Sequence, residues 1–169
     1  MTEDRLTALE QRLRELEDKQ EIVDLLASYG PLVDSGSADE VAALWSEDGV
    51  YDVDEICMNG RDEIRAMVRS DRHQGWIKGG CAHFLGPARV HVRGDSAVGV
   101  CHSLMIVNRG GDFETDPEFV VRRATAHHFE LERSAQGWVV TRRTSRVLDG
   151  RAEAPELLRS GALGSAAPN

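Results

Sequence analysis

Apolar residues recur at three- and four-residue steps near the start of the chain, which is the spacing of one face of an α-helix. The stripe contains Leu6, Leu9, Leu13, Leu16 and Val23, and Gln20 interrupts it. Thr2 and the two acids after it provide a helix start. Because Pro31 removes a backbone hydrogen bond, the pattern predicts that the helix kinks or ends near Gly30-Pro31.

The heptad-like spacing of these leucines has two interpretations. The helix either meets a partner helix or lies on the sheet of its own domain. Ile22, Leu25 and Leu26 widen the apolar stripe where the helix enters the body of the domain. We therefore expect the helix to lie on its own sheet, as amphipathic helices of globular domains usually do.

In the rest of the chain, apolar residues recur first with the period of a helix and then with the two-residue period of a strand. Ser37 or Asp39 caps a second predicted helix that runs through Ala43 to Trp45, and a loop rich in glycine is expected at 71–80. Hairpin turns are expected at 93–96 and 134–137, with a longer connection at 108–117. The remaining predicted elements are a strand at 49–53, a helix at 60–68, strands at 82–92, 96–108, 118–133 and 137–148, and a weak helix at 154–159.

Helices followed by a meander of strands predict an α+β protein. We expect a cone-shaped barrel, made by a strongly curved antiparallel or mixed sheet that three N-terminal helices close. Residues 1–150 form one domain in this prediction, with 1–20 as a helical extension and 151–169 as a partly mobile tail. A cavity inside the cone is the expected place for a ligand.

Composition narrows the possible functions. The chain has 169 residues and a net charge of −9, so it would repel nucleic-acid backbones and anionic membranes. Cys57, Cys81 and Cys101 show no spacing typical of a disulfide framework or a structural zinc. With no leader and no apolar run of about 18 residues, we expect a cytoplasmic protein.

Three residues supply the parts of an acid–base site. Tyr29 and Asp34 lie where the first helix is expected to end, and His83 opens a predicted strand. A neutral imidazole can accept a proton near neutral pH, and a carboxylate on its other nitrogen fixes the tautomer. Asp34 could instead cap the next helix, but Ser37 and Asp39 are better placed for that role.

Tyr29 is the third candidate catalytic residue, although it could also be core aromatic surface. Five residues along a regular helix turn by about 140°, so Tyr29 and Asp34 would share a pocket only if the helix kinks between them.

Further residues are candidates to line the cavity. We select His102, His127, Trp76 and Arg146 for substrate binding, with Trp76 as a lid residue on its loop. Arg142, Arg143 and Arg146 lie on one predicted strand, and one of them could face inward to bind a developing oxyanion. No metal is expected, because the histidines and Asp34 lack a recognisable ligand spacing. Asp48 and Tyr51 we interpret as structural.

The order of elements, together with Tyr29-x4-Asp34 and Ala-Leu-Trp-Ser-Glu-Asp-Gly-Val-Tyr at 43–51, resembles the SnoaL-like branch of the nuclear transport factor 2-like superfamily. The resemblance covers about residues 15–148. Tyr29, Asp34 and His83 are similar to the site of scytalone dehydratase, lindane dehydrochlorinase and the bile-acid 7α-dehydratases. The bile-acid 7α-dehydratases carry a further carboxylate on a central strand. At the corresponding place this chain has the neutral residues Ser-Leu-Met, at positions 103–105.

The resemblance implies a lyase that needs no cofactor, most simply a dehydratase acting on a hydrophobic cyclic compound. His83 would remove a proton next to a carbonyl, Asp34 would orient His83, and Tyr29 would assist the departing oxygen. An isomerase or polyketide cyclase would use the same pocket. A non-catalytic module is a further alternative, like the small subunits of ring-hydroxylating dioxygenases. The resemblance also implies a homo-oligomer, with a trimer favoured.

Overall fold

A curved seven-stranded sheet forms the centre of the protein in the computed structural model, which describes residues 2–110 and 118–168. Its strand order is β2-β1-β7-β6-β5-β3, with β4 paired to β5. All neighbouring strands are antiparallel except β1 and β7, which are parallel. The strands are β1 (Trp45–Val53), β2 (Ile56–Asn59), β3 (Cys81–Leu85), β4 (Arg89–Arg93), β5 (Ser96–Gly110), β6 (Glu118–Ser134) and β7 (Gly137–Val147).

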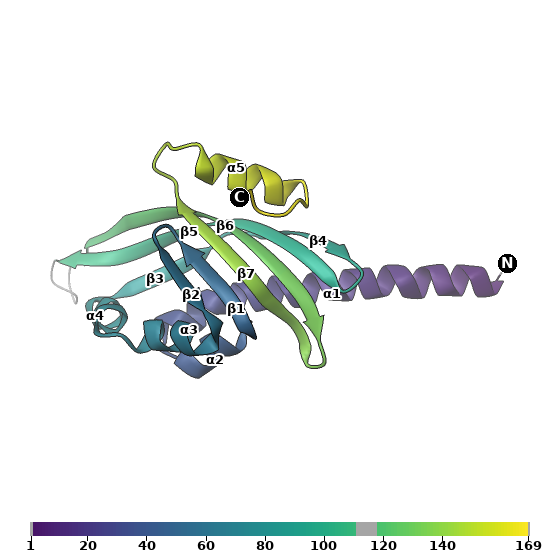
Figure 1. Cartoon of the computed structure of the whole chain (residues 1–169), viewed down its shortest axis with the longest axis horizontal. Coiled ribbons are helices and arrows are strands. Elements are labelled where there is room, and N and C mark those ends of the chain that lie inside the picture. Colours follow the sequence, from purple (N-terminus) through teal and green to yellow (C-terminus); the bar gives the residue numbers. More distant parts are fainter. Residues whose placement is uncertain (1, 111–117, 169) are drawn as a thin grey trace.

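Helices cover both faces of this sheet. Four precede β3, namely α1 (Thr2–Asp34), α2 (Ala38–Ala43), α3 (Gly60–Arg69) and α4 (Asp71–Gly79). They lie on one face, and α5 (Glu153–Ala162) lies on the other (Figure 1). The predicted α+β class with a curved, mixed sheet is confirmed. The sheet stays open rather than closing into a full barrel.

The glycine-rich segment at 71–79 is helical, so the expected loop was wrong and a fourth helix contributes to the helical layer. Its cap explains the difference. The Ser70 hydroxyl accepts a hydrogen bond from the His73 backbone N–H at 3.2 Å, which satisfies one of the free donors of the first turn. The expected strand 82–92 is also divided, into β3 and β4, by the Gly86-Pro87 pair. The two predicted hairpin turns are confirmed.

Helix α1 continues through Pro31 to Asp34, so of the two expected outcomes, a kink or an end near Gly30-Pro31, the end was wrong. The proline costs about 3 kcal/mol in a helix interior, partly by leaving the Ala27 carbonyl without its helical partner. Ala27 is exposed, so water can solvate that carbonyl. Tyr29 and Val33 are buried on either side of the proline, and this packing holds the last turn in place.

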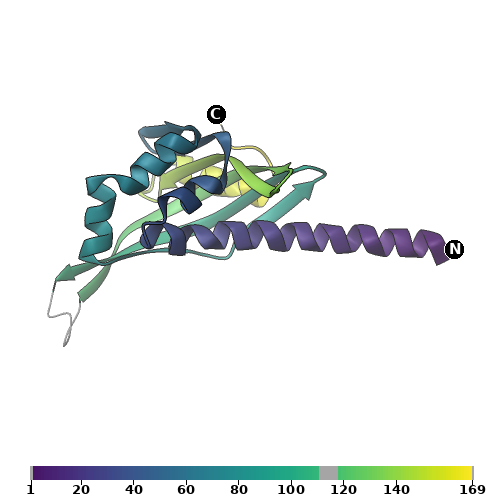
Figure 2. The ribbon, with the colours of Figure 1, turned by 90° about the horizontal axis from the view of Figure 1, so that it is seen from below.

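The first half of α1 does not lie on the sheet. Leu6, Leu9, Leu13 and Leu16 are 58%, 51%, 55% and 63% exposed. Figure 2 shows this part of the helix projecting beyond the rest of the protein. The expectation that the leucine stripe covers the sheet was therefore wrong for these residues. Contact with the sheet begins at Asp18, which accepts a hydrogen bond from Trp138 Nε1 at 3.2 Å.

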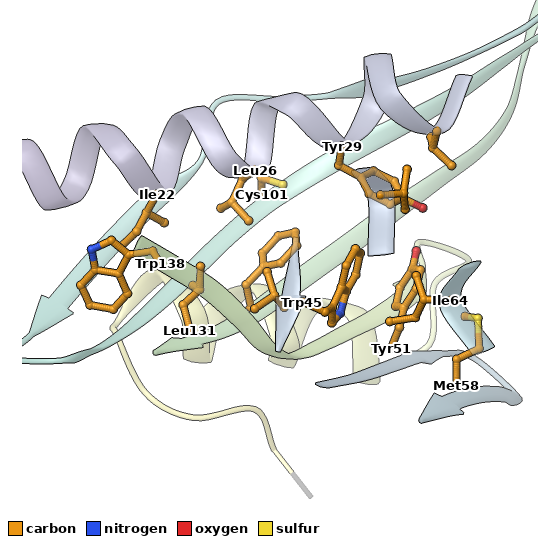
Figure 3. Close-up of a cluster of buried hydrophobic side chains, with 14 of the residues drawn as sticks. Ile22, Leu26, Tyr29, Trp45, Tyr51, Met58, Ile64, Cys101, Leu131 and Trp138 are labelled. Carbon is orange, nitrogen blue, oxygen red and sulfur yellow. The ribbon is translucent and has the colours of Figure 1, made fainter. Parts of the chain in front are cut away.

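The core lies between α1 and the sheet. Ile22, Leu26 and Val33 project from one face of α1 and are almost completely buried, as are Trp45 and Phe129 across from them. Figure 3 shows the cluster between α1 and the strands. This packing fixes the position of α1 along the sheet.

Gly30 allows α1 to approach β3 closely. A Cβ atom at Gly30 would lie 2.3 Å from the backbone oxygen of His83, which is closer than atoms can pack. Glycine at this position therefore brings the last turn of α1 directly against β3. As a result, the end of α1 and the start of β3 meet at the edge of the cavity.

Among the described residues, no helix is long and apolar enough to cross a lipid bilayer.

Candidate functional site

A cavity of about 530 Å³ opens between the helical layer and the inner face of the sheet. This volume suits a small organic ligand. Much of the wall is apolar, with Val53, Met58, Met67, Leu85 and Met105 among the lining residues. Polar lining residues come from β3, β5, β6 and β7, where alternate side chains point inward, and also from α1, β1 and the turn after it, α4 and residue 151.

Asp34 and His83 form a hydrogen-bonded pair at the cavity wall. Asp34 Oδ1 lies 2.6 Å from His83 Nδ1, and Asp34 Oδ2 accepts the His83 backbone N–H at 2.6 Å. The carboxylate thus holds both the ring and the backbone of His83. A proton on Nδ1 leaves Nε2 with a lone pair, and the His83 ring lines the cavity.

Tyr29 and Asp34 take different positions around His83. Tyr29 lines the cavity directly, and its ring centroid lies 6.4 Å from that of His83. Asp34 contacts His83 from the α1 side, so the unbroken helix does not prevent the three residues from forming one constellation. Burial raises the pKa of the Tyr29 phenol far above its usual value, and the neighbouring Tyr51 adds to the shift. Tyr29 therefore remains a hydrogen-bond donor at neutral pH.

Cys81 is the third group beside the pair. Its thiol lies 3.7 Å from Asp34 Oδ1, and one ligand atom from each of Asp34, Cys81 and His83 falls within 4.8 Å of the others. Burial raises the pKa of the Cys81 thiol to about 11, and the Asp34 charge adds to the shift. The protonated thiol and the Asp34–His83 contact form a hydrogen-bonded cluster, and a metal ion binding to these three residues would have to release their protons, because metal ligands are deprotonated.

Helix α4 supplies two further residues to the cavity. The His73 ring stacks on that of His83, with centroids 6.0 Å apart and planes inclined by 26°. His73 Nε2 lies 3.0 Å from the Val33 carbonyl oxygen, which fixes the proton on that nitrogen. Trp76 also lines the cavity, and the Arg122 guanidinium lies 4.6 Å from its ring centroid. Trp76 is on a helix, however, and not on the expected loop.

Arg143 is the buried cation of the cavity. It is 2% exposed, and its guanidinium carbon lies 4.0 Å from the Tyr29 ring centroid, 4.6 Å from that of Tyr51 and 5.1 Å from that of Phe129. No carboxylate among the described residues forms an ion pair with it, and Nη1 has no hydrogen-bond partner there. By contrast, Arg123 lines the same cavity but pairs with Asp54 at 2.6 Å.

His127 lies beside Arg143 and is held by two serine hydroxyls. Its Nε2 is 2.6 Å from Ser103 Oγ, and its Nδ1 is 2.7 Å from Ser145 Oγ. The Arg143 guanidinium also donates toward Nδ1 at 3.4 Å, so Nδ1 accepts and Nε2 carries the proton. Burial lowers the pKa of His127 well below its usual value, and the Arg143 charge lowers it further. His127 is therefore neutral at neutral pH.

Two predicted site residues lie outside the cavity. His102 is exposed, on the strand face opposite to Ser103, so its expected place in the cavity lining was wrong. Arg146 points to the α5 side of the sheet, where it forms a two-pronged ion pair with Asp52 at 2.8 and 2.9 Å. Successive side chains of a strand point to opposite faces, so His102 and Arg146 face outward because Ser103 and Ser145 face the cavity.

Three cavity residues that lie beside Tyr29 or His83 were not selected from the sequence. Tyr51 was interpreted as structural, Arg143 was grouped with two other arginines of its strand, and His73 lay in the expected loop. The Arg-Arg-x-x-Arg pattern at 142–146 already indicated that one cation could face inward. Nothing local to the sequence distinguished His73, because its role depends on the formation of α4.

These features define a class of protein in which a curved sheet and a helical layer enclose an apolar cavity with an Asp–His pair. Residues 14–144 match the SnoaL-like domain, and the chain belongs to this family. No curated protein matches the sequence.

Solved structures agree with this assignment. An NTF2-like protein with a cystatin-like fold from Novosphingobium aromaticivorans is 42% identical, with a TM-score of 0.84 over 89% of this chain and 94% of that one. A protein named as a candidate aromatic ring hydroxylase, from the same organism, is 25% identical, with a TM-score of 0.59 over 79% of this chain and 90% of that one. A candidate dehydratase of the NTF2-like family from Streptomyces avermitilis is 14% identical, with a TM-score of 0.61 over 78% and 97%, and shows the fold alone.

Proposed function

We propose that the protein is a cofactor-independent lyase, a dehydratase that eliminates water from a hydrophobic cyclic carbonyl compound. The observation that carries the proposal is the 2.6 Å contact between Asp34 Oδ1 and His83 Nδ1 at the wall of an apolar cavity. The contact supports a base at Nε2, and His83 lines the cavity where a ligand would lie.

His83 Nε2 removes a proton from the carbon next to the carbonyl. The electron pair of that C–H bond forms the new double bond, and the C–O bond to the leaving hydroxyl breaks. Asp34 keeps the ring in the required tautomer and stabilises the imidazolium that forms. A positioned base of this kind contributes on the order of 10²–10⁴ to the rate.

Arg143 and Tyr29 support the oxygen atoms of the reaction. Negative charge develops on the carbonyl oxygen as the proton leaves, and a buried guanidinium with no carboxylate partner in 2–110 or 118–168 is suited to stabilise it. Tyr29 keeps its proton and can donate to the carbonyl or to the departing hydroxyl. The leaving oxygen takes its proton from the His83 imidazolium, which returns His83 to its neutral form.

The cavity lining supports an apolar ring as substrate. Methionine, leucine and valine side chains form much of the wall, and Trp76 on α4 adds a flat apolar surface. The cavity of about 530 Å³ admits a molecule of several fused rings. A steroid-like or polyketide-derived compound satisfies both conditions.

An isomerase or polyketide cyclase is the second candidate function. The same base would abstract the same kind of proton, and only the fate of the carbanion would differ. The mass of the product distinguishes the reactions, because dehydration removes one water and isomerisation removes nothing. A non-catalytic module is less well supported, because a buried cation and a paired histidine converge on an open cavity.

The experiment begins with a panel of cyclic β-hydroxy ketones, selected by thermal shift and then analysed by mass spectrometry. The wild-type protein should convert at least one ligand with the loss of water. His83→Gln and Asp34→Asn should lower turnover by on the order of 10²–10⁴ while the melting temperature changes little.

Two matched variants serve as controls. His102→Gln changes an exposed histidine of the neighbouring strand, and Asp48→Asn changes an exposed carboxylate. Both should retain wild-type turnover. Undiminished turnover in His83→Gln would overturn the proposed base, and a product of unchanged mass would replace the dehydratase with the isomerase.

A further inference from the structure

The exposed half of α1 carries its apolar side chains on the side that faces away from the protein. In helical geometry of about 100° per residue, Leu6, Leu9, Leu13 and Leu16 point about 160° away from the direction of Ile22 and the other core residues of the same helix. The stripe therefore points away from the sheet of its own chain, and Figure 2 shows that this part of α1 projects beyond the body of the domain.

The stripe has the two alternating spacings of a coiled-coil seam. Steps of three, four and three residues separate the leucines, which places Leu6 and Leu13 at heptad position a and Leu9 and Leu16 at position d. Gln20 occupies the next a position. Val23, at the following d position, is already half-buried in the domain. The free seam among the described residues therefore ends near Gln20.

The charges on both sides of the seam follow the same repeat. Every g position is basic and every e position is acidic; the g residues are Arg5, Arg12 and Lys19, and the e residues are Glu3, Glu10 and Glu17. All six side chains are exposed. Residues at e and g of neighbouring helices form the ion pairs that set partner choice and orientation in coiled coils.

This charge pattern distinguishes the two possible orientations. In a parallel pair, g residues of one helix meet e residues of the next heptad in the other, so Arg5 meets a second Glu10 and Arg12 meets a second Glu17. In an antiparallel pair, g faces g and e faces e, which opposes like charges throughout. A second copy of this chain in parallel orientation is thus the partner whose charges fit.

We infer that the N-terminal half of α1 joins copies of this chain in a parallel coiled coil with its seam at Leu6, Leu9, Leu13 and Leu16. The continuation of the helix into the domain strengthens this surface. Asp18 pairs with Arg133 at 2.8 Å and contacts Trp138, so the helix is fixed at its base before it leaves the sheet. An anchored helix loses less conformational freedom on pairing than an isolated peptide of the same length.

Cysteine cross-linking in the full chain tests the orientation. In a Cys57→Ser, Cys81→Ser background, Leu6→Cys should form a disulfide-linked dimer, because the parallel arrangement places the two copies of position 6 opposite each other. Gln11→Cys, at position f of the same helix, is the matched control and should remain monomeric on denaturing gels. A mixture in which Leu6→Cys cross-links only to Leu16→Cys would overturn the parallel arrangement.

Charge exchange tests the ion pairs. One variant carries Glu at positions 5, 12 and 19, and a second carries Lys at positions 3, 10 and 17. Each should associate at least tenfold more weakly than the wild type, and an equimolar mixture should recover wild-type association, measured by light scattering and analytical ultracentrifugation. If the mixture does not recover, or if wild type has the mass of one 18.6 kDa chain at every concentration tested, the inference is wrong.

A Leu9→Lys, Leu13→Lys variant and its control, Thr7→Lys with Gln11→Lys, complete the test. The first removes the apolar seam, and the second adds the same charge on the opposite side of the helix. Only the first should lose the Leu6→Cys cross-link, and circular dichroism confirms that both retain the fold. Equal loss in both variants would contradict the assigned seam.

Discussion

The guanidinium carbon of Arg143 lies 4.0 Å from the centroid of the Tyr29 ring. A cation over an aromatic face is attracted by the negative potential of the ring, and the attraction is larger where water is excluded. Tyr51 and Phe129 provide further faces, which hold the charge in place without neutralising it. Arg143 therefore offers a positioned positive charge to a ligand in the cavity.

Arg143→Met should lower turnover by on the order of 10²–10³, because the group that stabilises the developing oxyanion is lost. The variant should unfold at an equal or higher temperature, since a buried charge is removed. Arg142→Met is the control on the opposite, exposed face of the same strand. If Arg143→Met turns over the substrate found in the screen as fast as the wild type does, Arg143 does not stabilise the oxyanion.

The buried His127 predicts a pH-dependent stability. Burial lowers the pKa of His127 in the folded protein, whereas the unfolded chain binds a proton near pH 6.5. The contribution of neutral His127 to the free energy of unfolding is thus fully present above about pH 6.5. As the pH is lowered further, this contribution decreases by up to about 1.4 kcal/mol per pH unit, until the pKa of His127 in the folded protein is reached. The free energy of unfolding of wild type minus that of His127→Gln should shrink between pH 7 and pH 5.

Urea titrations at several pH values measure this difference. His102→Gln is the matched control, because it removes an exposed imidazole without touching the buried network. A difference between wild type and His127→Gln that stays constant over the whole range would be inconsistent with a buried neutral imidazole.

The cysteines should react with iodoacetamide in a defined order. Cys57 is exposed, whereas Cys81 is partly buried and its pKa is raised to about 11. Because the thiolate is the nucleophile, Cys57 should be alkylated first at pH 8 and Cys81 only as the pH approaches 11. Peptide mass spectrometry reports the order. Equal rates at pH 8 would show that the Cys81 thiol is not held beside Asp34.

Gly30→Ala should destabilise the protein by about 1–3 kcal/mol, because the added methyl group would meet the His83 carbonyl oxygen. The shift of β3 away from α1 should also lower activity. Gly75→Ala is the control, since a Cβ there meets no atom within 4 Å and helix α4 favours alanine. Urea denaturation should show a loss for the first variant and a small gain of about 0.4–1 kcal/mol for the second.

Local patterns were sufficient to predict most helices and strands, whereas the grouping of Tyr29, Asp34 and His83 in one site was expected from the family resemblance. The choice between Arg143 and Arg146 depended on which face of β7 is concave, and that is set by pairing with β1 and β6. His102 was misassigned for a related reason. Both faces of β5 are apolar, because the cavity covers one and α5 packs on the other.

The end of α1 shows where local rules were overridden. Pro31 is a strong local signal, but the burial of Tyr29 and Val33 keeps the helix intact. Similarly, the glycines at 75, 79 and 80 indicated a loop. The Ser70 cap and the contacts of His73 with Val33 and His83 stabilise this segment as a helix. In both cases tertiary packing outweighed the propensity of single residues.

Helix α4 contributes His73 and Trp76 to the cavity, whereas Asp34 and His83, the pair proposed to transfer the proton, come from α1 and β3. The parts that would recognise a molecule and the parts that would transform it therefore reside on separate segments. Exchanging Trp76 for a side chain of different bulk, with His73 kept on the ring of His83, should change which compounds are accepted and leave the reaction itself intact. The fold thus allows the range of accepted compounds to change through one short helix, while the pair on α1 and β3 stays the same.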